Sequence, residues 1–327
     1  MPDMLAAVYE RLGAARDVLD VRRMPRPEPR PGEVRVRLRL SGVNPSDWRA
    51  RLHGRGTPLQ WQIPHSDGVG VVDAVGPGAD PGRIGSRVWV WNAAWRRRHG
   101  TAAQWTCVPD RQAVNLPEHV GDELAAGLGI PFITAWHALF ADGPLDGATV
   151  LVAGGAGAVG NAAVQLASRA GATVLATAST DEKARLARAA GASVVVDYRS
   201  SEAAAALRAA APDGVGRILE LALGRNLDLD LEVLADHGTV VVYAPEPEPP
   251  PIPVQRLMAR NIRTHFMLVY TIGPRAQEDA VRGITAALED GALTPLPTVW
   301  FPLHEVAAAH EAVERGVLGK VVLGLPE

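Results

Sequence analysis

The chain has 327 residues, 47% of them apolar, and a formal net charge of −3 at pH 7. This charge argues against nucleic acid as a main partner, because phosphate binding needs a basic face, and no apolar run approaches the ~18 residues of a membrane span. The single cysteine, Cys107, excludes an internal disulfide and a cysteine-based structural zinc, and residues 1–13 lack the apolar core of a secretory signal, so we expect a cytoplasmic protein.

The first third of the chain is rich in short predicted strands. Residues 33–40, EVRVRLRL, alternate strictly between apolar and charged side chains, which is typical of a half-buried strand. Further strands are predicted at 67–75 and 87–95, on either side of a turn-rich connection at 76–86. Short strands punctuated by glycine and proline predict a compact, barrel-like domain.

From about Leu124 the pattern changes to strands that alternate with alanine-rich helices. Strands are predicted at 148–153, 172–178, 192–197, 217–222, 238–244 and 261–270, and helices at 158–170, 181–190, 201–210 and 226–236. This alternation predicts an α/β domain with a parallel sheet covered on both faces. The proline run 245–253 is expected to form an extended crossover, and a further helix at 275–291 precedes a return to short strands.

A glycine-rich turn joins the first of these strands to its helix. It has the spacing G-x-G-x-x-G at Gly155, Gly157 and Gly160, and a second strand follows about 20 residues later. Such glycines let the backbone approach a pyrophosphate, whose charge the helix N-terminus favours. A tight turn without a ligand is the alternative.

The end of the second strand bears on the choice of nucleotide. An acidic residue there would bind the ribose hydroxyls of NAD, but this chain has Ser179 and Thr180, with Lys183 one helical turn later. Hydroxyls and a cation suit a 2′-phosphate, so we expect NADPH. Asp181 stands where a helix N-cap belongs, and Lys183 considered alone could be an ordinary exposed lysine.

Several segments in this order resemble one known family. They are SGVNPSDWR, IPHSDGVGVVDAVGPG, GTAAQWTCVPDRQAVNLPEHV, VLVAGGAGAVGNAAVQLA, ASTDEKARLARAAGASVVVDYR and GVLGKVVL. Across essentially the whole chain, the sequence is similar to the medium-chain dehydrogenases/reductases, most of all to their zinc-free quinone oxidoreductase (zeta-crystallin-like) branch. The resemblance implies a GroES-like barrel-type catalytic domain at 1–122, a Rossmann domain binding NADPH at 123–264, and a return to the catalytic domain at 265–327.

The resemblance also bears on metal binding. The zinc-dependent branch places a histidine just before the acidic position occupied here by Asp67, but this chain has Ser66 there, and no cysteine lies near Asn44. His65 is one position out of register, so we expect it to pack or to shape the cleft. Three zinc ligands with an open fourth position cannot be assembled, and no metal site is expected.

Family positions carry over residue by residue as what the resemblance implies. Asn44 and Asp47 match a substrate-cleft motif, and Arg49 stands where many members have tyrosine. The implied cofactor contacts are Thr134, Gly155, Gly157, Ala158, Val159, Gly160, Ser179, Thr180, Lys183, Tyr198, Phe266, Met267, Leu268, Gly319 and Lys320. A homodimer formed through the cofactor domain is also implied.

Without zinc to polarise an isolated carbonyl, we expect direct hydride transfer from NADPH to an activated acceptor, a quinone. The alternatives are an enone or 2-enoyl thioester reductase, and a structural or sensor protein that binds NADPH without turnover. Asn44 is the first candidate donor to the developing oxyanion and Arg49 the second.

Structural roles compete with these assignments. Asn44 could cap the Asn-Pro turn that it begins, and Asp47 could be a helix-start carboxylate. The proton would come from solvent, His53 or His65. We expect the run Arg96–His99 to be a solvated loop, with an anion or partner site as the alternative.

Overall fold

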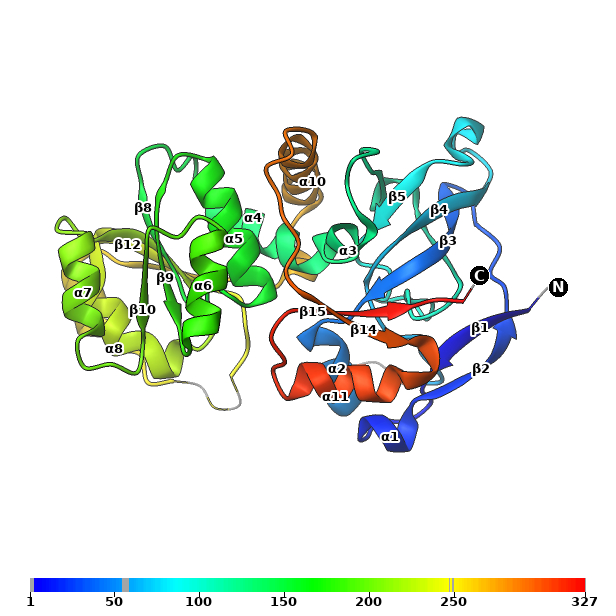
Figure 1. The fold of residues 1–327 in the computed structure, drawn as a ribbon, viewed down its shortest axis with the longest axis horizontal. Coiled ribbons are helices and arrows are strands. Elements are labelled where there is room, and N and C mark those ends of the chain that lie inside the picture. The colour runs from blue at the N-terminus through cyan, green and yellow to red at the C-terminus, as the bar shows by residue number, and fades with distance from the viewer. Residues whose placement is uncertain (1–2, 55–58, 247, 249, 327) are drawn as a thin grey trace. The chain divides into compact units, whose positions relative to one another are not determined.

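The computed structural model describes residues 3–54, 59–246, 248 and 250–326. Its contacts divide the chain into two compact units (Figure 1). The central unit comprises Pro131–Thr294, and the terminal unit combines Met1–Ile130 with Pro295–Glu327. The return to the terminal unit therefore comes at Pro295 and not at 265.

Within the described residues, the central unit holds a six-stranded parallel sheet in the order β10-β9-β8-β11-β12-β13. The strands are β8 (Thr149–Val152), β9 (Thr173–Ala178), β10 (Val194–Asp197), β11 (Val215–Glu220), β12 (Leu234–Val242) and β13 (Arg263–Phe266). This is the strand order of a doubly wound dinucleotide-binding sheet. The predicted α/β fold class is confirmed.

The helices of the central unit follow the predicted alternation. They are α4 (Ile133–Phe140), α5 (Ala158–Arg169), α6 (Asp181–Ala189), α7 (Ala203–Ala210), α8 (Leu223–Val233), α9 (Val254–Ala259) and α10 (Pro274–Glu289). The described part of the proline run 245–253 is neither helix nor strand, and residues 247 and 249 lie outside the described residues.

Helix α10 belongs to the central unit because it packs on α4. The contact is unusually close: a Cβ at Gly283 of α10 would lie 1.8 Å from Cη2 of Trp136 on α4. Only a glycine lets the indole lie against the helix backbone at this distance. This packing accounts for the late return of the chain to the terminal unit.

The terminal unit is built mainly from antiparallel strands. Its described residues form a seven-stranded sheet in the order β14-β15-β3-β4-β5-β7, with β6 paired to β3, and a separate β1-β2 pair. The strands are β1 (Asp3–Val8), β2 (Asp20–Pro25), β3 (Glu33–Gly42), β4 (Asp67–Val75), β5 (Arg87–Val90), β6 (Trp105–Pro109), β7 (Ala113–Asn115), β14 (Thr298–Pro302) and β15 (Lys320–Gly324). The predicted barrel-type β domain is confirmed.

The alternation predicted for β3 is also present. Its apolar side chains are buried in a core shared with β4, β5 and β6. Arg37 and Arg39 are exposed, whereas Arg35 is buried because Asp73 and Glu28 pair with its guanidinium at 2.9 Å and 3.0 Å.

Among its described residues, the terminal unit also has the α-helices α1 (Ala15–Val18), α2 (Pro45–His53), α3 (Asp122–Ala125) and α11 (Val306–Glu314). Helices α1, α2 and α11 pack on one another, as Figure 1 shows on one side of β14 and β15. Within the described part of the chain, no helix is both long and apolar enough to cross a membrane.

Candidate active site

The glycine turn between β8 and α5 is shaped by close backbone packing. A Cβ at Gly160 would lie 2.2 Å from the carbonyl oxygen of Gly154, so only glycine fits at the start of this helix. Gly154 itself has a φ of 66°, in the left-handed region that favours glycine. The peptide N–H of Gly155 donates to the carbonyl of Thr177 at 3.0 Å, which ties the turn to the end of β9.

This turn fits a pyrophosphate. Gly157 is the N-cap of α5, is exposed, and has no side chain to cap the helix. The N–H groups of the first helical turn have no acceptor inside the helix, and the helix dipole favours an anion beside them. The residues predicted to bind the cofactor here, Gly157 to Gly160, therefore lie together around one helix N-terminus.

A second cluster of predicted residues lies at the carboxyl end of β9. The ammonium Nζ of Lys183 donates to the hydroxyl of Ser179 at 3.3 Å, so these two are brought together. The guanidinium of Arg199 donates to the main-chain carbonyl of Ser179. Two cations thus meet at one serine. Ser179 and Arg199, but not Lys183, line a pocket of about 430 Å³, whose lining also includes Arg188 and the acids Asp181 and Asp197.

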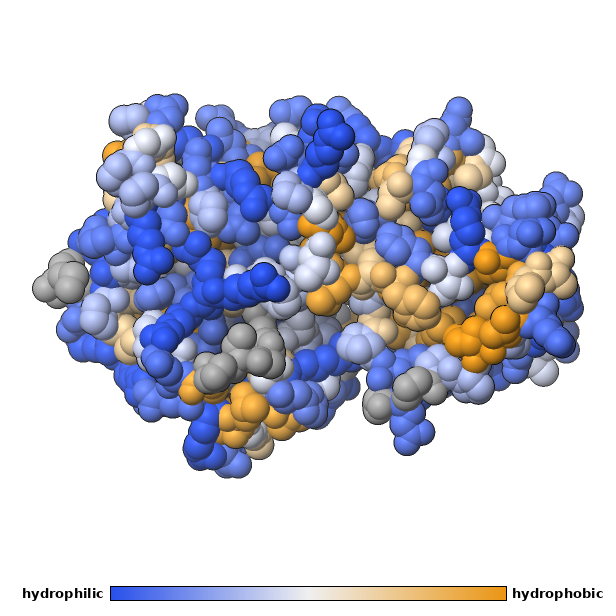
Figure 2. All heavy atoms as spheres, turned by 180° about the vertical axis from the view of Figure 1, so that it is seen from behind, coloured by the Kyte–Doolittle hydropathy of each residue, from blue (hydrophilic) through white to orange (hydrophobic). Residues whose placement is uncertain are grey.

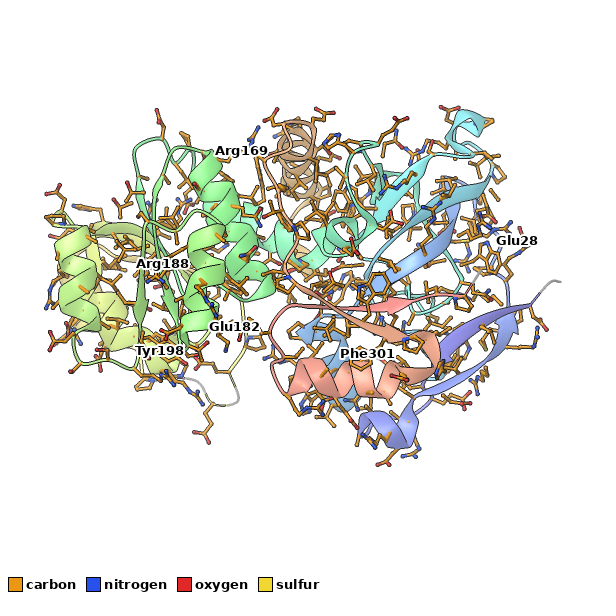
Figure 3. The ribbon with its side chains drawn as sticks, viewed as in Figure 1. Glu28, Arg169, Glu182, Arg188, Tyr198 and Phe301 are labelled. Carbon is orange, nitrogen blue, oxygen red and sulfur yellow. The ribbon has the colours of Figure 1, made fainter. Side chains whose placement is uncertain are left out.

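Thr180 and Tyr198 have different surroundings from those expected. Thr180, not Asp181, is the N-cap of α6, and its hydroxyl accepts from the N–H of Lys183 at 3.3 Å. Tyr198 (labelled in Figure 3) is 42% exposed and is absent from the pocket lining, whereas its neighbour Arg199 is present.

Sequence reasoning therefore missed Arg199. The strands β9 and β10 are parallel neighbours, with Asp197 opposite Ala178, so residues just after β10 lie beside Ser179. The guanidinium also forms a bidentate pair with Asp197 at 2.9 Å and 2.7 Å, which lowers the pKa of that carboxyl to about 2.

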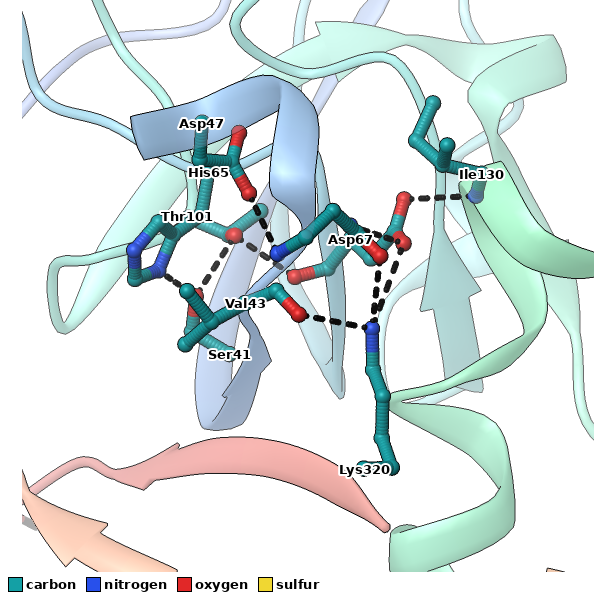
Figure 4. A network of polar contacts seen from close by, with 9 residues as sticks. Ser41, Val43, Asp47, His65, Asp67, Thr101, Ile130 and Lys320 are labelled. Atoms are coloured by element: carbon teal, nitrogen blue, oxygen red, sulfur yellow. Dashed lines mark hydrogen bonds and ion pairs between the residues drawn. The ribbon is translucent and has the colours of Figure 1, made fainter. Parts of the chain in front are cut away.

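In the terminal unit, the predicted Asn44 lies in a buried polar network (Figure 4). Its amide Nδ2 donates to a carboxylate oxygen of Asp67 at 2.7 Å, and its Oδ1 accepts from Nζ of Lys320 at 2.8 Å. Nζ also donates to the carbonyl of Val43 at 3.1 Å and lies 4.0 Å from Asp67. The peptide N–H of Ile130 donates to the other carboxylate oxygen of Asp67 at 2.9 Å.

Burial shifts the pKa values of both charged partners. The pKa of Asp67 is raised to about 6, because desolvation of the carboxylate outweighs the attraction of Lys320 and the hydrogen bonds from Asn44 and Ile130. Desolvation likewise lowers the pKa of Lys320, against the attraction of Asp67 and Asp47. Each charge therefore depends on the other.

The roles expected of Asp47, Arg49 and Lys320 are sharpened by these contacts. Asp47 is buried, and its carboxylate accepts the main-chain N–H of Asn44 at 2.8 Å, as expected for the helix-start alternative. Arg49 is half-buried and lies over the ring of Trp48, 5.2 Å from its centroid. Lys320, assigned to the cofactor by the resemblance, is 5% exposed and holds Asn44.

One compositional feature could have drawn attention to Lys320. Of the 33 basic residues in the chain, only Lys183 and Lys320 are lysines. An ammonium is a compact charge that fits between three oxygens, whereas a guanidinium is a wide planar fork. In a chain this rich in arginine, a lysine therefore indicates a site where a compact ammonium fits and a guanidinium does not.

His65 does not reach this network through its ring. Its Nδ1 lies 2.9 Å from the hydroxyl of Ser41 and its Nε2 lies 2.9 Å from Nε2 of His310. Arg51 donates to Nδ1 of His310 at 3.4 Å, so His310 must donate through Nε2 and His65 through Nδ1. Both rings are neutral, because burial lowers the pKa of each.

This assignment makes a continuous hydrogen-bonded chain. The hydroxyl oxygen of Ser41 accepts the hydrogen bond from Nδ1–H of His65, so the Ser41 hydroxyl donates to the hydroxyl of Thr101 at 2.8 Å. Thr101 in turn donates to the main-chain carbonyl of Asp67 at 2.6 Å. The chain of side chains ends on the backbone of the residue that holds Asn44. Of the two roles expected for His65, packing in the core or shaping the cleft, its position matches the first.

The remaining predicted residues are distributed over both units. Thr134 is buried on α4, and the N–H of Met267 donates to the carbonyl of Val242 at 2.9 Å. Phe266 and Leu268 are 64% and 48% exposed. Gly319, next to Lys320, has a φ of 112°, and a Cβ there would lie 2.3 Å from the carbonyl oxygen of Pro297, so this glycine is required by the backbone.

Two sequence profiles match the chain. That of the alcohol dehydrogenase GroES-like domain matches residues 30–118, and that of the zinc-binding dehydrogenase matches residues 158–285. The quinone oxidoreductase of Pongo abelii is 30% identical over 303 residues, which cover 91% of this chain and 90% of the relative. The chain belongs to the quinone oxidoreductase family of the medium-chain dehydrogenases/reductases. It is therefore an oxidoreductase that uses a nicotinamide cofactor.

Solved structures agree with this family fold. A mycobacterial protein solved in complex with NADPH is 30% identical, with a TM-score of 0.86 over 99% of this chain and 100% of that one. An NAD-dependent alcohol dehydrogenase is 28% identical, with a TM-score of 0.87 over 99% and 100% of the two chains. The quinone oxidoreductase fold alone therefore does not select between the two nicotinamide cofactors.

Proposed function

We propose that this quinone oxidoreductase family member transfers hydride from NADPH to a quinone without a catalytic metal. The observation that carries the choice of NADPH is the pair of cations, Lys183 and Arg199, gathered at Ser179. A 2′-phosphate is a dianion with several acceptor oxygens, which an ammonium, a guanidinium and a hydroxyl can bind together. The carboxylates of Asp181 and Asp197 also line the pocket at Ser179, and Asp197 forms an ion pair with Arg199, so a 2′-phosphate would replace Asp197 as the partner of that guanidinium.

The donor set around Asp67 supports chemistry without zinc. Zinc needs three or four unprotonated nitrogen, sulfur or carboxylate ligands, but the partners of Asp67 are an amide, a peptide N–H and the ammonium of Lys320. Among the described residues, no group of three or more His, Cys, Asp or Glu side chains could hold a metal ion. We therefore propose that the ammonium of Lys320 supplies the positive charge beside Asp67 and Asn44.

NADPH, when bound, supplies the hydride. The glycine turn would hold its pyrophosphate, and Ser179, Lys183 and Arg199 would hold its 2′-phosphate. Lys320 polarises the carboxamide of Asn44 through Oδ1, while one of the two Nδ2 hydrogens goes to Asp67. We propose that the second Nδ2 hydrogen is donated in a hydrogen bond to the oxygen of the acceptor, where negative charge develops during hydride transfer. The proton that completes the reduction comes from solvent.

A turnover screen tests this proposal. The purified protein should oxidise NADPH in the presence of ortho- and para-quinones, followed at the absorbance of the reduced nicotinamide, and Asn44→Ala should lower kcat by roughly 10²- to 10³-fold. Arg23→Ala, at an exposed position on β2 outside the network of Asn44, serves as the control. Activity confined to enones or 2-enoyl thioesters would identify the alternative reductase, and tight NADPH binding with no acceptor in either panel would identify a binding protein without turnover.

We also propose a homodimer formed through the central unit. Strand β13 is an edge of the parallel sheet, with backbone groups available for pairing, and Met258 and Phe266 nearby in the chain are 71% and 64% exposed. Figure 2, seen from behind, shows apolar side chains gathered on part of the central unit, on the right of that view. A reducing, cytoplasmic location accords with the single buried cysteine.

Sedimentation measures this association. The parent protein should sediment at twice the 34.6 kDa of one chain, and Met258→Glu should shift it to the single-chain mass, because a charge would be buried at the interface. Val317→Glu, at a position 40% exposed in the terminal unit, should leave the mass unchanged. A parent that sediments as a single chain would contradict the dimer.

A further inference from the structure

A second pocket lies wholly within the terminal unit, away from the network of Asn44. It has a volume of about 600 Å³, within the range of small-molecule sites. Its lining comes from the end of β1, the end of α2, residues 59–62 and residues 94–98. Helix α2 separates Asn44 at its N-cap from Gly54 at its C-cap, about 15 Å by helical rise.

The walls of this pocket are held in place by one glutamine. The backbone of Gln62 pairs with Tyr9 in both directions, at 2.9 Å and 3.0 Å. Its side-chain amide donates to the carbonyls of Arg97 and Arg98 at 2.9 Å and 3.1 Å. Gln62 therefore joins the strand wall to the arginine loop, and the pocket is preformed.

Close backbone crossing fixes the same loop at its end. A Cβ at Gly100 would lie 2.1 Å from the carbonyl oxygen of Pro64, and the N–H of Gly100 donates to the carbonyl of Ile63 at 3.0 Å. Arg97 donates to Glu33 at 2.8 Å and to the carbonyl of Cys107 at 2.7 Å. Arg97 thus anchors the loop, and its charge is neutralised within the protein.

The other two arginines of the loop have no such partner. Arg98 lies over the ring of Trp61 and Arg96 over that of Trp95, each 5.6 Å from the centroid. Both guanidinium groups are exposed, and neither pairs with a carboxylate among the residues that the structure describes. The lining, as far as it is described, contains no acidic side chain at all.

Two indoles beside two unneutralised guanidiniums define the chemistry of a ligand. Trp61 packs against the core of the unit and has His99 edge-on at 5.1 Å, so its ring is a fixed platform for a flat ligand. Arginine prefers carboxylate geometry and stacks on aromatic planes. From this arrangement we propose that the pocket binds a planar aromatic compound that carries a carboxylate.

Calorimetric titration with naphthalene-2-carboxylate, and with its neutral analogue naphthalene-2-carboxamide, tests the proposal. The carboxylate should bind about tenfold more tightly than the amide, because charge-assisted hydrogen bonds are the stronger class. Arg96→Gln combined with Arg98→Gln should abolish this preference. Arg23→Gln combined with Arg37→Gln, which removes the same charge from exposed positions on β2 and β3, should preserve it.

A second variant separates stacking from charge. Trp61→Leu should weaken both naphthalene compounds by a similar factor, and cyclohexanecarboxylate should bind the parent less well than naphthalene-2-carboxylate does. Equal affinity for acid and amide, no measurable binding of either, or an acid preference unaffected by the loss of Arg96 and Arg98 would each overturn the proposal.

Steady-state kinetics of the same protein distinguish whether the natural carboxylate ligand is part of the hydride acceptor or a separate molecule. Competition between naphthalene-2-carboxylate and the quinone in steady-state turnover would assign the pocket to the acidic end of the hydride acceptor. Inhibition or activation without competition would assign it to a separate ligand. Binding is measured without turnover, so a protein inactive on quinones can still support this pocket, and an active one can refute it.

Discussion

Replacing Lys320 with methionine is expected to lower the free energy of unfolding of the terminal unit by about 3–5 kcal/mol at pH 8. Methionine fills much of the space of the lysine stem but leaves the carboxylate of Asp67 buried without its cation. It also removes the donor to Asn44 Oδ1 and to the carbonyl of Val43. Seven of the eight tryptophans lie outside the central unit, which contains Trp136, so denaturation followed by tryptophan fluorescence reports mainly on the terminal unit.

The pH dependence of this loss identifies its cause. The pKa of Asp67 is about 6 in the folded protein against an ordinary 3.8, so the ionised carboxylate opposes folding above pH 6. That cost disappears as the pH falls through 6 toward 3.8. Without Lys320 the pKa of Asp67 should rise further, and the deficit of the variant should be much smaller at pH 5 than at pH 8.

Lys183→Met is the matched control, because it removes the other lysine of the chain from a partly exposed helix. Its stability should remain within about 0.5 kcal/mol of the parent at both pH values. A deficit of Lys320→Met that is the same at pH 5 and pH 8 would attribute the loss to packing and would contradict the charge pairing.

Replacing Lys183 with alanine should weaken NADPH by about 10- to 100-fold and leave NADH within about twofold. A hydrogen bond to a charged group contributes about 1.5–3 kcal/mol, and every 1.4 kcal/mol is a factor of ten. Arg199→Ala should weaken NADPH at least as much, because it also leaves the carboxylate of Asp197 without its cationic partner beside the site. Dissociation constants from fluorescence titration of the two reduced cofactors measure this selectivity.

Arg185→Ala is the control for this pair of variants. Arg185 is exposed on α6, only two residues from Lys183, and, unlike Lys183, makes no hydrogen bond to Ser179 among the described residues. Its loss should affect NADPH only through the long-range field, which salt screens. An equal loss of NADPH and NADH in Lys183→Ala would refute a role in binding the 2′-phosphate.

The central unit could be predicted from sequence almost element by element, because its signals are local. Apolar strands, alanine-rich helices and the glycine spacing each act within a few residues. The clearest shift is in α8, predicted at 226–236 and observed at Leu223–Val233. The carboxylate of Glu246 accepts the N–H of Gly224, in the first turn of the helix, at 2.8 Å, and so stabilises the start of this helix without an ordinary capping residue.

The network around Asn44 could not be predicted in the same way. Asn44 and Lys320 are 276 positions apart, and no local pattern indicates that β3 and β15 are neighbours. Asp67 begins β4, where its sequence reads as part of an ordinary strand. The cluster at Ser179 was accessible in part, since Lys183 is one helical turn away, but Arg199 enters it only because β9 and β10 lie side by side.

The burial of Lys320 has a consequence for covalent chemistry at amines. Its Nζ is enclosed by Val43, Asn44 and Asp67, so acylating reagents in solution cannot reach it while the terminal unit is folded. Lys183 is then the one lysine side chain of the two that such reagents can acylate. Mass spectrometry of the acylated protein therefore measures whether a bound ligand covers the ammonium of Lys183. Acylation of Lys320 would instead mark local opening of the terminal unit.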